Sequence, residues 1–459
     1  MDVLAINTVL NRVVFGLEAK FVFLAVGLVL TVALGFIQFR RLGVIVSETL
    51  GAIRERAQGF GGQITPFQAA MVAIAATVGT GHFVGMIAAI LTGGPGAVFW
   101  MWIGYLLGMA TKFAEATLAV HFRRSYTDGT VSGGPMFYIS RGLGDRFGRF
   151  GNILGGAFAL FAAIAAFGIG NLSQSGAVGS SLQTAFNVPP AITGLAVAVI
   201  VGLIIGGGIR RIAAFAQVIV PIKLLLLALA IIPLLVVHAA QIPAAFAQIF
   251  DAAFNLQALV GGTLGAYIAL INAGLGRGIF ANEAGLGSAP IAHAQAQVDH
   301  PVRQGFWGVA EMLVSLIVTT LMALTFLASG LWQQEDIGSA TKAAVTMFQV
   351  YPLSIGQIIQ ALTLAALAFG TMVSWAFYGE EAASYLFGEG IRWPYRMAFV
   401  VMAFVAPIGR EFQAFISISD TLNGFMAIPN LLALLLLAPL VARLVREFFQ
   451  GEPWRAPKD

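Results

Sequence analysis

Cysteine is absent from the chain of 459 residues, and charged residues are scarce. Asp, Glu, Lys and Arg make up 10% of the sequence, whereas 58% is hydrophobic and the mean hydropathy is +0.87. The lack of cysteine excludes a disulfide framework and a thiolate metal site. So few charges cannot coat the roughly three soluble domains that this length could form. The composition therefore argues against a soluble enzyme and favours a chain whose solvent is largely lipid.

Recognisable catalytic motifs are lacking as well. The Gly-Gly-Gly triplet at 206–208 lies within an apolar stretch that has no P-loop lysine, which argues against phosphate binding. The five histidines include no His-x-x-x-His pair that could hold a catalytic metal. The net charge of +4 is better explained by basic residues kept on the cytoplasmic side of a membrane than by nucleic-acid binding. We therefore expect no enzymatic activity, no catalytic residue, no bound cofactor and no nucleic-acid partner.

Long, uninterrupted apolar stretches dominate the sequence and predict an all-α polytopic membrane protein in the lipid bilayer. Because a span needs about 20 residues, the sequence predicts about eleven transmembrane helices. The predicted spans are residues 20–39, 67–92, 97–120, 152–186, 191–209, 212–237, 259–287, 305–331, 355–386, 394–409 and 413–442. The stretch 152–186 exceeds a straight span, so we expect it to tilt strongly or to continue past the bilayer.

The basic residues of the loops predict the orientation of these spans. If the N-terminus lies outside, most loop Lys and Arg fall on the inner side, and the outer side retains only Arg12, Lys20, Lys342 and Arg410. Cytoplasmic loops carry an excess of Lys and Arg. We therefore expect a multi-pass protein of the plasma membrane (the cell inner membrane of a bacterium) with an outer N-terminus and a cytoplasmic C-terminus. Three further basic residues lie within spans, namely Lys112, Lys223 and Arg277.

An odd number of spans suits an internal repeat with one additional helix. Residues 1–66 are interpreted as an extra N-terminal helix and connector, and residues 443–459 as a cytoplasmic tail. The remaining spans divide into 67–237 and 259–442, with five helices each. Because five is odd, the second half must enter the membrane with the opposite topology. That is the arrangement of transporters with inverted repeats.

The first helix of each half contains a glycine cluster at membrane depth, within residues 75–83 and 272–280. Glycine in a helix interior costs about 1 kcal/mol relative to Ala, so several at alternate positions favour unwinding. An unwound helix would offer amide groups to a carboxylate and carbonyl groups to an ammonium or a sodium ion. The alternative is that the glycines only permit close helix packing. The two corresponding positions favour a binding site at the middle of the membrane.

Several strings of the sequence resemble the alanine/glycine:cation symporter family between about residues 60 and 435. They are Gly79-Thr80-Gly81, residues 93–102, 108–115, 128–136 and 282–294, Gly170-Asn171 with Gln174, Trp375 to Glu380, and Asp420 with Asn423. The resemblance implies the leucine-transporter fold, with five plus five inverted spans. It also implies sodium-coupled symport of a small neutral amino acid such as alanine or glycine. Proton-coupled or uncoupled amino-acid transport is the alternative, and a channel is less favoured.

The resemblance also implies the binding residues. It places the substrate carboxylate at Thr80 and Gly81, beside His82, and the amine near the backbone from Gly274 through Gly276 to Gly278. The side chains of Gln174, Phe280 and Trp375 should line the pocket. Sodium, as the coupling ion, would bind the carbonyl groups of Ala75 and Val78 and the hydroxyl groups of Thr371 and Ser374, because hard cations prefer oxygen donors.

His82 departs from the family pattern, which usually has Asn at this position. A charged imidazole there would occupy space where some relatives of the fold hold a second sodium ion, and histidine titrates in the physiological range. The alternative is a purely structural hydrogen bond within the break. A second departure is near Ser315, where relatives often carry Asp.

Charged residues within the predicted spans should be paired or functional, because burying a charge in lipid is costly. Lys112 and Glu115 are three residues apart on one predicted helix, so we expect them to neutralise each other. Glu311, Glu380 and Asp420 have no close basic neighbour in sequence. Their partners must therefore come from other helices.

Overall fold

The computed structural model describes residues 3–53, 61–127, 129–254, 264–334, 337, 339–409 and 412–457. Asp128, Arg410 and the first residues of the predicted span 259–287 lie outside this part of the chain. The described residues are almost entirely helical, as predicted. Strands β1 (Arg124–Ser125) and β2 (Val131–Ser132) form one short antiparallel hairpin.

The helices of the first half of the chain are α1 (Val3–Phe15), α2 (Leu17–Ala33), α3 (Ile37–Arg40), α4 (Leu42–Ala52), α5 (Pro66–Thr77), α6 (Thr80–Gly93), α7 (Ala97–His121), α8 (Pro135–Phe147), α9 (Arg149–Phe167), α10 (Ser173–Phe186), α11 (Pro190–Ile205), α12 (Gly208–Val237) and α13 (Ile242–Phe254). Those of the second half are α15 (Leu264–Phe280), α16 (Ala289–His293), α17 (Pro301–Ala328), α18 (Ala340–Thr346), α19 (Leu353–Phe387), α20 (Arg392–Val405) and α21 (Gln413–Gln450). A π-helical turn, η1 (Gly168–Leu172), joins α9 to α10. Short 3-10 turns are η2 (Ala239–Gln241), η3 (Leu331–Gln333), η5 (Met347–Val350) and η6 (Glu389–Ile391).

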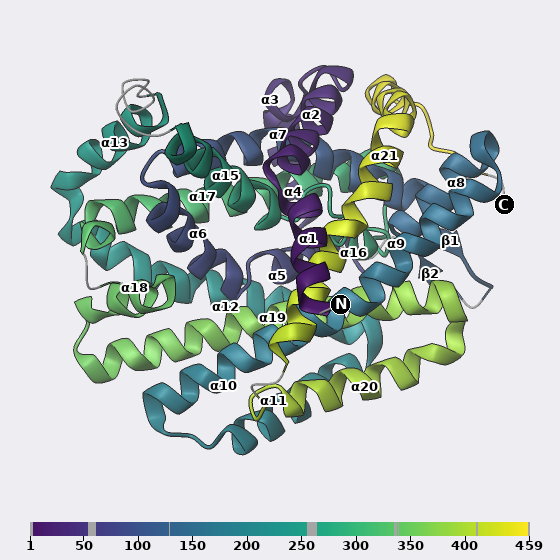
Figure 1. Ribbon diagram of the computed structural model, residues 1–459. Coiled ribbons are helices and arrows are strands. Elements are labelled where there is room, and N and C mark those ends of the chain that lie inside the picture. Colours follow the sequence, from purple (N-terminus) through teal and green to yellow (C-terminus); the bar gives the residue numbers. More distant parts are fainter. Residues whose placement is uncertain are drawn as a thin grey trace.

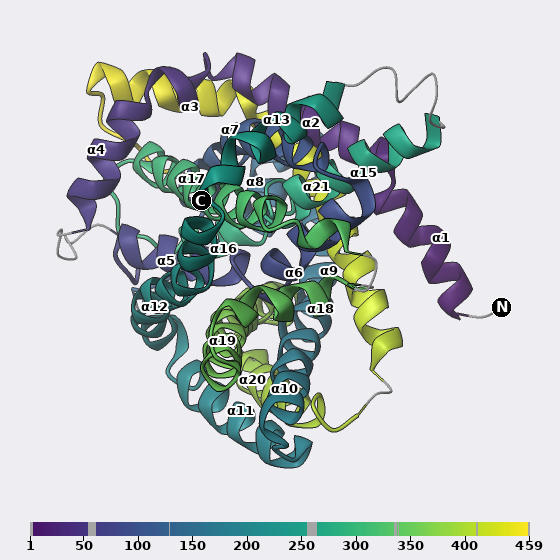
Figure 2. The same ribbon diagram turned by 90° about the vertical axis from the view of Figure 1, so that its left-hand side faces the viewer.

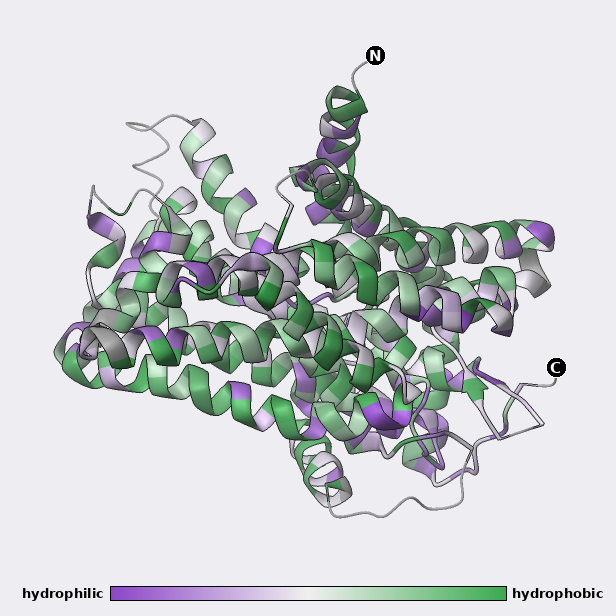
Figure 3. Cartoon of the chain, turned by 90° about the horizontal axis from the view of Figure 1, so that it is seen from below, coloured by the Kyte–Doolittle hydropathy of each residue, from purple (hydrophilic) through white to green (hydrophobic). Residues whose placement is uncertain are grey.

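Among the described residues, seven helices are long and apolar enough to cross a membrane, and the bent pair α5–α6 raises the number to eight. The predicted number of eleven is not confirmed by this criterion. Helices α11, α15 and α20 occupy predicted spans, but they have only 16, 17 and 14 residues. Apolar residues run along the long helices, whereas hydrophilic residues gather at helix ends and near the C-terminus (Figure 3).

Helix α19 lies roughly across the view of Figure 1, whereas α21 runs steeply through it. Helix α8 and the hairpin lie at one end of the molecule in this view, and α13 and α18 lie at the other. Helix α7 packs against both α15 and α17, and α5 packs against α12, α16 and α19. Helix α1 projects from the side of this bundle, as Figure 2 shows. Helix α21 continues to Gln450, so the segment predicted as a tail from residue 443 begins as helix.

The first predicted helix break is present between α5 and α6. Helix α5 begins with a capping box, in which the Thr65 hydroxyl and the Gln68 side chain satisfy each other's backbone N–H groups. It ends at Thr77, and α6 begins after Val78 and Gly79 with a bend of 47°. The break therefore leaves carbonyl groups at the end of α5 and amide groups at the start of α6 without helical partners.

The second break lies further along the chain than the sequence predicts. Helix α15 continues through the whole glycine cluster 272–280. An added Cβ on Gly278 would lie 2.7 Å from the Met101 oxygen of α7, and one on Gly274 would overlap the Ala97 oxygen. These glycines therefore permit close packing, and the prediction of unwinding there was wrong. The chain unwinds at residues 281–288, where φ is positive at Glu283, Gly285 and Gly287.

The long apolar stretch predicted at 152–186 forms α9, η1 and α10 in sequence, a continuous helical run from Arg149 to Phe186. The π-helical turn at its middle is fastened to α20, because the Asn171 amide donates to the Phe399 oxygen at 2.7 Å. The Ser175 hydroxyl donates to the Ala403 oxygen, also at 2.7 Å. π-helical turns are frequent at functional sites.

Candidate functional site

The start of α6 combines free backbone amides with open space. The Thr80 hydroxyl donates to the Gln174 side-chain oxygen at 2.7 Å, which joins α6 to α10 just after the π-helical turn. Gly81 is exposed, and an added Cβ there would meet no atom within 4 Å. The N–H groups of Thr80 and Gly81 find no acceptor among the described residues. A helix N-terminus of this kind attracts an anion such as a carboxylate.

Trp375 packs against the π-helical turn that precedes Gln174. Its side chain is buried, and it packs so closely on Gly170 of the π-helical turn that any Cβ at Gly170 would overlap it. The Tyr378 ring lies edge-on to it, with 5.7 Å between ring centroids. Thr80, Gln174 and Trp375, which the sequence predicts to be binding residues, are thus linked through Gln174 and the π-helical turn that precedes it.

The remaining predicted substrate residues lie elsewhere. Phe280 packs edge-on against Phe15, with 4.4 Å between ring centroids, and lines a cavity of about 380 Å³. Gly276 lies beside Lys20, whose ammonium group donates to the Asn272 oxygen at 3.0 Å. The same cavity is lined by Asn11, Phe15, Lys20, Ala88, Ala89, Thr92, Ala269, Asn272, Ala273, Gly276, Arg277, Phe280 and Asp420. The structure therefore divides the predicted substrate residues between two places.

His82 faces the second half of the chain. One ring nitrogen lies 2.7 Å from the Thr319 hydroxyl of α17, and the other lies 3.4 Å from the Ala281 oxygen at the end of α15. The Tyr105 hydroxyl contacts the same Thr319 hydroxyl at 2.9 Å. Tyr105 could not be predicted to take part in a polar cluster, because such a ring near a predicted span end is typical of the membrane interface.

The carbonyl groups predicted to bind sodium are in contact with a lysine. The Lys223 ammonium group of α12 donates to the oxygens of Ile74 at 2.9 Å, Ala75 at 3.1 Å and Val78 at 2.8 Å. Its side chain is fully buried. The sequence signal for this contact was a single basic residue within an apolar span, which is expected to be functional or paired.

The two hydroxyl groups of the predicted sodium site also lie against α5. The Thr371 hydroxyl is 3.2 Å from the Ala76 oxygen and 3.4 Å from the Ala75 oxygen. The Ser374 hydroxyl donates to the Val72 oxygen at 2.8 Å. The structure thus brings the end of α5 close to α19 at the first break, where the residues Ala75, Val78, Thr371 and Ser374 lie near one another.

Lys112 does not pair with Glu115, contrary to the sequence prediction. Its ammonium group contacts the Glu311 carboxylate of α17 at 3.1 Å. The Thr77 hydroxyl, at the end of α5, donates to the same carboxylate at 2.6 Å, and His293 lies 3.4 Å from it. The close packing of α7 on α17 provides this partner, which the spacing along one helix cannot reveal.

Glu115 is instead bound to the second break and to α21. Its carboxylate accepts from the Gly285 N–H at 3.1 Å and from the Asn430 amide at 2.6 Å. The carboxylates Glu115 and Glu311 thus hold α7 and α17 to the ends of the broken helices.

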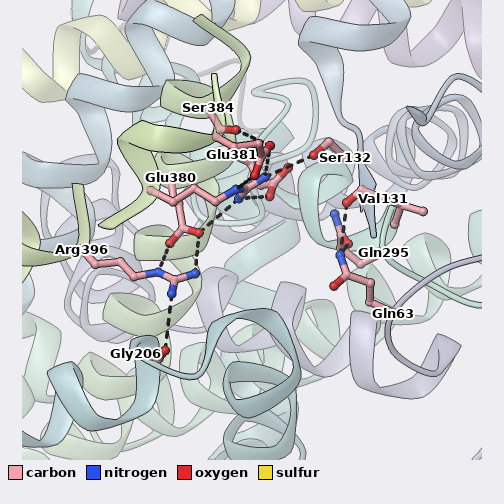
Figure 4. A network of polar contacts seen from close by, with 11 residues as sticks. Gln63, Val131, Ser132, Gly206, Gln295, Glu380, Glu381, Ser384 and Arg396 are labelled. Carbon is pink, nitrogen blue, oxygen red and sulfur yellow. Dashed lines mark hydrogen bonds and ion pairs between the residues drawn. The ribbon is translucent and has the colours of Figure 1, made fainter. Parts of the chain in front are cut away.

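Glu380 finds its partners on α20 and at its start, outside its own helix, as predicted. The Arg396 guanidinium of α20 contacts the Glu380 carboxylate of α19 at 2.5 Å and 2.6 Å (Figure 4). Arg392 joins the same cluster through Glu381 at 2.5 Å. Asp420 and Arg277 line the same cavity as Phe280.

Two interrupted helices that meet inside an apolar helical bundle define a membrane transporter with a central site. The chain belongs to the sodium:alanine symporter family, whose sequence profile it matches over residues 2–456. It is therefore a member of a transporter family and not an enzyme.

The relatives of the chain include two transporters that match nearly end to end. The sodium/alanine symporter AgcS of Methanococcus maripaludis is 40% identical, over 98% of each chain. An uncharacterized transporter of Haemophilus influenzae is 38% identical, over 98% of this chain and 97% of the relative.

Among solved structures, MhsT in complex with L-phenylalanine superposes with a TM-score of 0.58 and 16% identity, over 84% of this chain and 99% of that one. A manganese transporter of Eremococcus coleocola superposes with a TM-score of 0.51 and 14% identity, over 84% and 88% of the two chains. These similarities show the leucine-transporter fold.

Proposed function

We propose that the protein is a sodium-coupled symporter of a small neutral amino acid such as alanine or glycine. The observation that carries the proposal is the start of α6, where the amides of Thr80 and Gly81 border open space beside Gln174. The 40% identity to a relative named a sodium/alanine symporter supports the substrate class and the ion. Residues 67–237 and 259–442 would be the two inverted repeats that alternate access to this site.

The substrate carboxylate would accept hydrogen bonds from the Thr80 and Gly81 amides, where the helix dipole favours negative charge. Gln174 would orient it, and Trp375 would cover the substrate side chain. Because α15 is intact through Gly274 and Gly276, the ammonium group would bind the free carbonyl groups after Phe280 instead. The charge distribution supports an outer N-terminus and a cytoplasmic C-terminus in the plasma membrane.

Uptake by proteoliposomes tests the function. We expect alanine or glycine to accumulate against its gradient when an inward sodium gradient is imposed, and not when choline replaces sodium. Accumulation driven by a proton gradient alone would identify a proton-coupled transporter. Passive equilibration without any ion gradient would identify an uncoupled carrier or a channel, and either result would overturn the proposal.

A charge placed beside the substrate carboxylate tests the site. Gln174→Glu keeps the acceptor for the Thr80 hydroxyl but adds a negative charge, so we expect the KM for alanine to rise by at least about tenfold, or 1.4 kcal/mol. Gln241→Glu, in the exposed turn η2, is the matched control and should leave the KM unchanged. Equal KM values in the two variants would place the carboxylate elsewhere.

A further inference from the structure

At the end of α5, every N–H donor of the Lys223 ammonium group has a hydrogen-bond acceptor. An ammonium group has three N–H donors and no acceptor. The three donors of Lys223 match three carbonyl oxygens, those of Ile74, Ala75 and Val78, at 2.8 to 3.1 Å. Within the described residues, no carboxylate lies at ion-pair distance from Lys223, and Glu311 acts on it only from further away.

The helix break leaves two of these carbonyl groups, those of Ala75 and Val78, without a helical partner, whereas the Ile74 oxygen also accepts from the Val78 N–H. All three lie at the C-terminal end of α5, where the helix dipole is negative. A cation at this position is therefore stabilised by α5 whether it is an ion or a side chain. Lys223 supplies that charge from α12, which packs directly against α5 and α19.

A sodium ion at this position would need the same oxygen lone pairs. Ala75 and Val78 cannot coordinate the ion and accept from the ammonium group along the same direction. If Lys223 withdrew, its charge would lie among the apolar side chains of α12 at membrane depth, which is costly. The lysine is therefore held in place both by the bonds that it makes and by the lack of an alternative partner among the described residues.

We propose that the Lys223 ammonium group is the resident cation of this carbonyl site and excludes sodium from it, so that a coupled sodium ion binds elsewhere in the protein. The proposal rests on the proposed function only for the existence of a coupled ion. The Thr371 and Ser374 hydroxyl groups then fasten α19 to α5 and do not coordinate the coupling ion.

The test measures sodium binding by thermal unfolding of the purified protein, with sodium chloride replaced stepwise by choline chloride. Five proteins are compared: wild type, Thr371→Val, Lys223→Ala, the double variant of these two, and Lys223→Arg. We expect the single variant Thr371→Val to differ from wild type by less than about twofold in the sodium concentration that gives half-maximal stabilisation. In Lys223→Ala, the vacated carbonyl groups should create an additional sodium response, which Thr371→Val should remove. Lys223→Arg retains the charge and should create no such response.

A rise of fivefold or more in the half-maximal sodium concentration of Thr371→Val, in the wild-type background, would show that sodium uses this site and would overturn the proposal. Folded Lys223→Ala without a new sodium response would also overturn it. If Lys223→Ala does not fold, the comparison of wild type with Thr371→Val still shows whether sodium uses this site. A wild type that shows no sodium response contradicts the proposed sodium coupling, while the response of Lys223→Ala still tests the role of the lysine.

Discussion

Gly81→Ala is the substitution that most directly tests the anion site at the start of α6. The Cα–Cβ bond of a helical residue tilts toward the helix N-terminus, so the new methyl group would point at the space in front of the free amides. Because it would meet no protein atom within 4 Å, the folded structure should accommodate it without strain. Replacing glycine by alanine in a helix should even stabilise the protein, by up to about 1 kcal/mol.

The methyl group should, however, displace a carboxylate from the amides of Thr80 and Gly81. A hydrogen bond to a charged group contributes about 1.5–3 kcal/mol, so the loss of one such bond should raise the KM for alanine about tenfold to a hundredfold. Uptake kinetics and thermal unfolding of the same preparation measure the two effects separately. We expect a higher KM together with an unchanged or higher unfolding temperature.

Gly144→Ala in α8 is the matched control, because an added Cβ at Gly144 also meets nothing within 4 Å. It should have the same small effect on stability and no effect on the KM. If Gly81→Ala leaves the KM within twofold of wild type, the substrate carboxylate does not bind at the start of α6. If Gly81→Ala unfolds the protein, the space beside Gly81 is not open and the reasoning is wrong.

Three further predictions concern other residues. Trp375→Phe removes the indole group that packs against Gly170 of the π-helical turn, and uptake should fall by more than about tenfold in a folded protein; wild-type uptake would remove Trp375 from the site. Lys112→Met leaves Glu311 buried without its cation, which should destabilise the protein by about 3–5 kcal/mol in thermal unfolding, and adding Glu311→Gln should restore most of the loss. His300 caps α17 with a neutral ring nitrogen, and burial lowers its pKa to about 4. Its stabilising effect should therefore be present above pH 6.5 and lost as the pH falls toward 4, and His300→Asn should abolish this part of the pH dependence of unfolding, whereas an unchanged profile would refute it.

The sequence predicts features that depend on composition and on neighbours along the chain. The apolar stretches predict the helical bundle, and Gly79 with Gly81 marks the first break correctly. The lack of basic neighbours near Glu311 and Glu380 correctly indicates partners outside their own helices.

Features that depend on packing between distant helices are not predictable in this way. The glycines at 274, 276 and 278 suggest an unwound helix by their alternate spacing. Only the close approach of α7 shows that Gly274 and Gly278 permit helix packing and not unwinding. The spacing of Lys112 and Glu115 suggests an ion pair, but Glu311 approaches from α17. Lys223 is visible as a lone charge in an apolar span, whereas the oxygens that it meets depend on how α12 packs on α5.

The π-helical turn η1 has a mechanical consequence for the transport cycle. Successive residues of an α-helix are about 100° apart around its axis, so one inserted residue turns α10 relative to α9 by about that angle. Gln174 therefore faces α6, while Asn171 and Ser175 remain fastened to the carbonyl groups of α20. Any rotation of α20 must therefore also move the segment from Asn171 to Ser175. This movement would change the distance between Gln174 and Thr80 at the start of α6.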